Sequence, residues 1–280
     1  ADKVKVSLEA LAKTDVAPNF DSIADSTEGA IATFQQFNIA ARDLEKTFGA
    51  INAVSAAFAV ESADIITVIK RSGGSFEAAG GSLNDLISLF TSVRATTRES
   101  AETIATGIRT IFTRLQRKST GNFLQQLGID VRNLDGSFVG PLKSIEALSN
   151  ALRNIPTESP IFAEIVEELG GFRQISKVIP LIKQFDTAQR ALAVARSGQN
   201  SLIRDTAIAE DSVIRKTEKV KESFLELFRS ITSNRAFQGM IKLMLDVADK
   251  AVVLAKAFEP IIPGLLALGA VKGIVAGKKV

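Results

Sequence analysis

The chain of 280 residues contains no histidine and no cysteine. This excludes the commonest zinc ligands, the usual general base at neutral pH, thiol nucleophiles and disulfide bonds. Tryptophan and tyrosine are also absent, so all the aromatic residues are phenylalanine. The sequence therefore lacks the amphipathic rings that mark membrane interfaces and binding hot spots. We expect a protein that is not an enzyme and that needs no metal and no cofactor.

The sequence also lacks a strong excess of charge of either sign, because it has 34 Lys and Arg residues and 31 Asp and Glu residues. A net charge of +3 is too small to indicate a nucleic-acid partner, so any contact with genomic DNA is not expected to be specific. The hydrophobic content of 46% is nevertheless enough for a buried core. The chain begins at Ala1, and no apolar run typical of a signal peptide follows, so we expect an excerpt of a longer protein.

Apolar residues at alternating steps of three and four residues indicate long helices in the N-terminal region, 1–74. This heptad stripe runs over 31–69, with Gly49 as a weak point and Gly73-Gly74 as the expected helix end. A seam of this kind is typical of helices that associate, so we predict that these residues line an oligomer seam. The predicted seam residues in this region are Phe34, Phe37, Leu44, Phe48, Ile51 and Phe58.

Residues 75–187 are interrupted by glycine pairs and prolines, which predicts a compact module of short helices. Ser82 and Asp85 form a capping-box pattern that opens a helix over 83–93. Thr97 and Glu99 suit the first turn of a second helix that ends near Leu115. The segment 133–138 carries an Asp-Gly turn signal and permits a small hairpin.

The heptad pattern resumes over 188–258 and predicts two long helices in a coiled coil or bundle. Its predicted seam residues are Val220, Phe224, Leu227, Ile231, Phe237, Ile241, Met244, Ala248, Ala251, Ala255 and Phe258. The final segment, 259–280, is apolar and glycine-rich, and Gly269, Gly273 and Gly277 have the small-residue spacing of close helix contacts in membranes. The predicted fold class is thus all-α, with long heptad-patterned helices on both sides of a compact multi-helix module.

The patterns that could support chemistry are weak. Gly73-Gly74-Ser75 and Gly80-Gly81-Ser82 lack the Lys-Ser/Thr of a phosphate-binding loop, and acidic residues at helical spacing, such as Glu99 and Glu102, are typical of solvated helix faces. One basic cluster stands out: Arg109, Arg114, Arg117 and Lys118. Two interpretations remain open, namely cations that compensate a helix dipole and a contact with an acidic partner.

Three blocks of sequence, at 75–117, 123–152 and 168–182, carry a family resemblance. They read SFEAAGGSLNDLISLFTSVRATTRESAETIATGIRTIFTRLQR, FLQQLGIDVRNLDGSFVGPLKSIEALSNAL and ELGGFRQISKVIPLI. In this order they resemble the core region of bacteriophage tail tape measure proteins. The resemblance covers about 60–185, close to half of the chain.

The resemblance implies a mostly helical virion protein that fills the lumen of the tail tube, sets tail length during assembly and is released at infection to assist DNA passage across the host envelope. It implies as partners further copies of the chain, the tail tube protein, distal tail and tail-tip hub proteins, tail assembly chaperones and, after ejection, the host membrane. Because a compact module needs a wide lumen, we expect it near one end of the tail.

Two other readings stay open at this point. A membrane-active, pore-forming helical protein would use the heptads as a soluble bundle and insert the segment 259–280. An enzyme that works through carboxylates alone would need a convergent acidic pair in a deep pocket.

Overall fold

The computed structural model describes residues 2–209, whose regular elements are all helices, with no strand among them, so the predicted all-α class is confirmed. A further helical stretch covers 201–209. The elements are α1 (Asp2–Val16), α2 (Ile23–Phe37), η1 (Ala41–Asp43), α3 (Leu44–Ala57), α4 (Ser62–Ala78), α5 (Leu83–Thr97), α6 (Ala101–Leu115), α7 (Lys118–Gln126), α8 (Pro141–Leu152), α9 (Pro160–Leu169), η2 (Phe172–Gln174), α10 (Ile175–Lys183) and α11 (Phe185–Ser197).

Helix α5 lies at the centre of the core and packs against α4, α6, α8, α10 and α11. Its apolar residues Leu86, Ile87, Leu89, Phe90 and Val93 are all fully buried. A helix that is apolar around most of its circumference must be covered on several sides, and this explains why so many elements surround α5. Ser88, Thr91 and Ser92 are buried too, and their hydroxyls donate to backbone carbonyls of the same helix.

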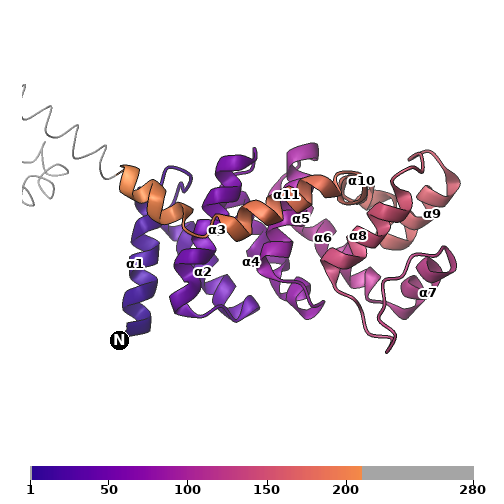
Figure 1. The fold of residues 1–280 in the computed structure, drawn as a ribbon, viewed down its shortest axis with the longest axis horizontal. Coiled ribbons are helices and arrows are strands. Elements are labelled where there is room, and N and C mark those ends of the chain that lie inside the picture. The colour runs from indigo at the N-terminus through magenta and orange to yellow at the C-terminus, as the bar shows by residue number, and fades with distance from the viewer. Residues whose placement is uncertain (1, 210–280) are drawn as a thin grey trace, which may run out of the picture. The chain divides into compact units, whose positions relative to one another are not determined.

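Helix α11 turns the chain back across the helices that precede it, and it packs against both α5 and α3 (Figure 1). A buried polar network then joins the residues after α11 to the start of the chain. The Asn52 amide donates to Ser201 Oγ and to Asp205 Oδ2, both at 2.7 Å, and accepts from Asn19 Nδ2 at 2.8 Å. Asn52 is 0% exposed, so water cannot reach its polar atoms and these hydrogen bonds satisfy them instead.

The continuous helix predicted from the heptad stripe over 31–69 is wrong. The chain leaves helical conformation after Phe37, where Asn38 adopts a left-handed conformation (φ 50°), and again after Ala57. The stripe thus falls on α2, α3 and α4, which have 14 to 17 residues each. An apolar spacing of three and four residues arises from several short amphipathic helices in a row as readily as from one long helix.

Gly49, the expected weak point, lies inside α3 without a break, and the predicted helix end at Gly73-Gly74 is wrong; close packing explains both glycines. A Cβ on Gly49 would lie 1.9 Å from the carbonyl oxygen of Gln199, which follows α11. A Cβ on Gly73 would lie 2.2 Å from Gln36 Oε1 of α2. Glycine therefore permits close approach inside continuous helices here, and α4 runs through Gly73-Gly74 to Ala78.

Helix α4 crosses the predicted boundary at 74/75, and α11, which begins at Phe185, crosses the one at 187/188. The described residues of the predicted N-terminal region thus pack in one unit with the predicted core module, through contacts of α4 with α5 and α6. Within that module, the capping box of Ser82 and Asp85 is confirmed at the start of α5. Thr97 instead ends α5, and Ser100 caps α6.

The predicted hairpin is reduced to a tight turn closed by a single antiparallel bridge between Arg132 and Phe138. Gly136 has a φ of 83°, as the turn requires, and Asp135 Oδ1 accepts from the backbone and the hydroxyl of Ser137. The hydroxyl and the amide of Ser137 both hold the pKa of the Asp135 carboxyl below its usual value. Leu134, at the tip, is fully exposed, so no apolar face extends this turn into a sheet.

Candidate interaction surface

The predicted basic cluster lies at the end of α6 and the start of α7. Arg109 and Arg114 belong to α6, Arg117 is the residue before α7, and Lys118 is the first residue of α7. A shallow groove of about 350 Å³ is lined by Arg109, Thr110, Thr113, Arg114 and Arg117. The structure thus gathers three of the four predicted cations around one groove, and the fourth is their neighbour in the chain.

Arg114 differs from the other three cations because it has a partner within the chain. Its Nη1 donates to the carbonyl oxygens of Glu167, at 2.9 Å, and Glu168, at 3.4 Å. These carbonyls belong to the last turn of α9, where the helix dipole is negative and the carbonyl groups lack helical partners. Arg114 therefore holds α9 against α6, a role that the sequence does not reveal because the two helices are far apart in the chain.

Arg109, Arg117 and Lys118 are exposed, and none of them forms an ion pair within residues 2–209. Along the exposed side of α6 between Arg109 and Arg117 the neighbours are threonines, so no carboxylate of this helix offsets the two guanidinium groups there. Guanidinium groups bind carboxylates and phosphates through paired, charge-assisted hydrogen bonds. The surface can therefore bind an anionic group.

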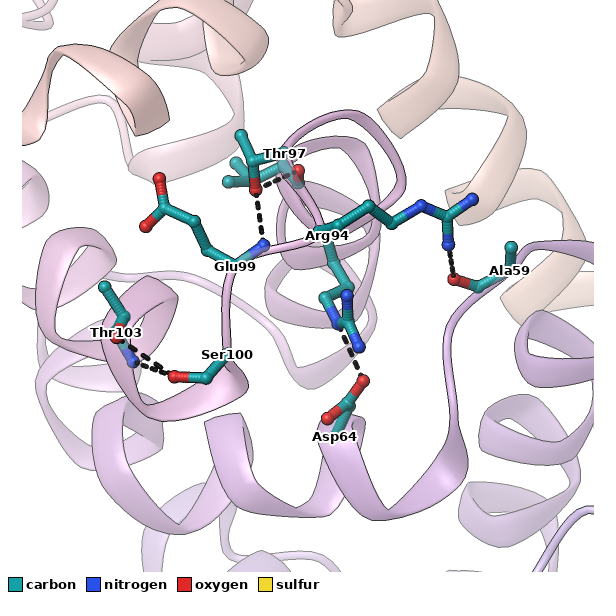
Figure 2. Close-up of polar contacts among 9 residues, drawn as sticks. Ala59, Asp64, Arg94, Thr97, Glu99, Ser100 and Thr103 are labelled. Atoms are coloured by element: carbon teal, nitrogen blue, oxygen red, sulfur yellow. Dashed lines mark hydrogen bonds and ion pairs between the residues drawn. The ribbon is translucent and has the colours of Figure 1, made fainter.

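The corner before α6 fixes the direction of this helix, and Figure 2 shows its polar contacts. Arg94 of α5 forms an ion pair with Asp64 of α4 at 2.7 Å (Figure 2). Arg98, which ends α5 in a left-handed conformation (φ 58°), donates from Nη1 to the carbonyl oxygen of Ala59 at 2.8 Å. Ser100 Oγ then accepts from the amide of Thr103 and caps α6 (Figure 2).

A buried ion pair adds a third attachment at this corner. Glu99 Oε2 lies 2.5 Å from Nζ of Lys177 in α10, and the Lys177 side chain is only 6% exposed. Burial by itself raises the pKa of Glu99, but hydrogen bonds from Lys177 and Ser176 and the charge of Lys177 outweigh it and hold the pKa below its usual value. Glu99 thus does not belong to the first turn of α6, as the sequence predicted, but anchors the corner to α10.

Two further acidic side chains, Glu102 and Glu168, have partners of their own. Glu102 lies in the first turn of α6, and its pKa is lowered mainly by its own backbone amide. Glu168 Oε1 accepts from the hydroxyl of Thr120 at 2.5 Å. Among residues 2–209, no cluster of three or more acidic side chains is placed to hold a metal ion.

The predicted seam residues of the N-terminal region have partners within one chain. Leu44, Phe48 and Ile51 are buried in α3, and the ring of Phe48 makes an edge-to-face contact with Phe20 at 5.7 Å. Phe34, Phe37 and Phe58 are half-buried and pack against the same core. Intrachain packing thus accounts for their apolar character, and a seam between copies stays a prediction.

Several predictions lie outside the described residues. They concern the seam residues over 220–258 and the glycines Gly269, Gly273 and Gly277 of the segment 259–280. Within the described part, no helix is both long enough and apolar enough to cross a membrane.

Comparison with known proteins gives one family match. The family model described as phage-related minor tail protein matches residues 1–171, which is more than half of the 280 residues. The match covers α1 to α9, including the basic groove and the corner before α6. No solved structure matches the chain significantly.

Proposed function

Because the chain belongs to the phage-related minor tail protein family, it is a bacteriophage tail component of the virion, and we propose that it acts there as the tape measure. In this role it fills the lumen of the tail tube and determines tail length during assembly. At infection it leaves the tube and assists DNA passage across the host envelope. It is a structural protein, without catalytic activity of its own and without a cofactor.

The observation that carries the proposal is where the resembling blocks lie in the fold. The blocks at 75–117, 123–152 and 168–182 resemble the tape measure core region, and they supply α5, α6, α8, η2 and nearly all of α10. These helices form the interior of the packed unit around α5. The stretch that resembles tape measure proteins thus corresponds to a folded module and not to scattered short segments.

No single helix of the packed unit is long enough to act as a ruler. Its helices have 17 residues at most, which is about 26 Å at 1.5 Å per residue. The ruler in this proposal is therefore the heptad-patterned sequence outside the packed unit, including 213–258. The packed unit sits near one end of the tail, where the lumen is wide. Its partners there are other copies of the chain, the tail tube protein, tail assembly chaperones, and distal tail and tail-tip hub proteins.

The experiment is a series of heptad deletions from the predicted long helices of the full-length protein, with tail length measured by electron microscopy. Each deleted heptad is expected to shorten the tail by about 10 Å. As a matched control, a heptad is replaced by another heptad of equal length, and the tail is expected to keep its length. Tails of unchanged length across the deletion series would contradict the tape measure role.

The contribution to DNA passage is assigned to the segment 259–280 and has a separate test. A synthetic peptide of this segment is expected to bind liposomes and release a trapped dye, since its small-residue spacing permits close helix contacts in a bilayer. A peptide with Gly269, Gly273 and Gly277 changed to leucine is the control for close contacts. A native peptide that neither binds nor leaks dye would contradict membrane entry and leave the ruler role intact.

A further inference from the structure

Three cations of the candidate surface remain available for a partner. Arg109, Arg117 and Lys118 are exposed, whereas Arg114 is engaged with the carbonyl groups of α9. We call these three residues, with the groove beside Arg114, the basic surface. Arg109 and Arg117 are eight positions apart, one within α6 and the other just after its end, and they provide two binding points for anionic groups.

An exposed aromatic residue lies on an element that touches α6. Phe172 of η2 is 63% exposed. Element η2 packs on α6, because a Cβ on Gly107 of α6 would lie 2.7 Å from Gln174 Oε1. Aromatic residues and arginine are both enriched in protein interfaces, and this part of the molecule exposes Phe172 on η2 and Arg109 on α6. Strong binding of DNA would need more phosphate contacts than three cations supply.

The complementary surface is found on the same chain. Asp15 is in the last turn of α1, Asp21 lies between the helices, and Asp25 is in the first turn of α2. All three are exposed, and none forms an ion pair within residues 2–209. Val16, between them in sequence, is 41% exposed. We call Asp15, Val16, Asp21 and Asp25 the acidic corner. It offers carboxylates for the guanidinium groups and an apolar side chain for Phe172.

The two surfaces cannot meet within one copy. Among the described residues, α1 and α2 lie at one end, and α7 and α9, against which the end of α6 packs, lie at the other (Figure 1). We propose that the basic surface of one copy binds the acidic corner of the next. A contact between two different surfaces is heterologous, and it forms a ring when the rotation between copies closes. The placement of this ring around the tail axis rests on the proposed function, but the contact itself does not.

Charge reversal tests the contact in the full chain, with sedimentation velocity as the measure of association and circular dichroism as the check on folding. One variant carries Arg109→Glu and Arg117→Glu, and the other carries Asp15→Lys and Asp21→Lys. Each variant alone is expected to associate at least about tenfold more weakly than the native chain. An equimolar mixture of the two is expected to associate again, because native surfaces pair with each other and reversed surfaces pair with each other. Added salt is expected to weaken the native association.

The matched control carries Arg190→Glu and Arg196→Glu, the same change of charge on the exposed side of α11, and is expected to associate like the native chain. If reversal prevents folding, the milder Arg109→Gln, Arg117→Gln variant is expected to weaken association as well. Association that neither reversal changes, or a mixture that stays dissociated, would overturn the contact. The contact would also be overturned if the native chain bound duplex DNA but did not associate with other copies, and if only the arginine variant lost this DNA binding.

These outcomes separate the contact from the proposed function. If the mixture associates but heptad deletions leave tail length unchanged, the contact between copies is supported and the tape measure role is contradicted. If tail length decreases with each deletion but the mixture stays dissociated, the tape measure role is supported and the contact is contradicted.

Discussion

The ion pair between Glu99 and Lys177 gives the sharpest prediction about stability. In Glu99→Gln the amide keeps the size of the side chain but removes the charge that neutralises Lys177, whose side chain is 6% exposed. Breaking a fully buried pair costs about 3–5 kcal/mol. A quarter of the Glu99 side chain reaches solvent, and Lys177 Nζ keeps a bond of 3.0 Å to Ser176 Oγ, so we expect the lower value of about 2–3 kcal/mol.

The assay is chemical and thermal unfolding of the native chain, Glu99→Gln, Lys177→Met and the double variant. For a unit of this size, the expected loss lowers the melting temperature by roughly 4–10 °C. Lys177→Met leaves Glu99 only partly buried and is expected to cost less. The double variant is expected to be more stable than Glu99→Gln, because no unpaired charge remains in the core.

The pH dependence supplies an independent check on the same pair. The pKa of Glu99 is lower in the folded chain than in the unfolded chain, so the unfolded chain binds the proton more readily. The stabilisation is therefore fully present above the unfolded pKa and is lost as the pH falls through the folded pKa. The stability difference between the native chain and Glu99→Gln should shrink in acid. A loss under about 0.5 kcal/mol at neutral pH, or a difference that does not change with pH, would refute the reasoning, because an exposed pair behaves that way.

Three further variants test the packing. In α4, Gly73→Ala should destabilise the chain by about 1–3 kcal/mol, because the new Cβ would meet Gln36 and Phe37, whereas Gly74→Ala, at an exposed position, should stabilise it by up to about 1 kcal/mol. Equal effects of the two variants on urea unfolding would contradict the close approach of α2 to Gly73. Arg114→Ala should cost about 1 kcal/mol and increase amide exchange at the end of α9, whereas Arg109→Ala should change neither measurement. Asn52→Leu should cost about 2–3 kcal/mol by leaving Ser201 and Asp205 without their amide partner, and no loss in denaturant titration would show that water replaces it.

The features that the sequence predicts well are local. The capping box at Ser82 and Asp85 needs only residues three apart, and the end of α6 at Leu115 follows from the apolar period of one helix. The basic cluster was also found because its residues are neighbours in the chain. The order of helices over 83–115 was therefore largely predictable.

The features that the sequence does not predict depend on residues far apart in the chain. In the sequence alone Gly49 suggests a weak point in the helix, but in the fold the backbone of Gln199 lies against it and leaves no room for a side chain. Glu99 resembles a first-turn residue until Lys177, 78 positions later, is placed beside it. The heptad stripe was misread as one helix because no proline marks the breaks at 38–40 and 58–61, and nothing local tells a seam between copies from an intrachain core.

The tape measure role is tested most directly by the slope of tail length against residue number. Deletions and insertions of whole heptads in the predicted long helices of the full-length protein are compared with equal-length replacements, and tails are measured by electron microscopy. The account predicts a straight line of about 1.5 Å per residue through both series. A slope of zero, with normal tails assembled from every variant, would contradict it.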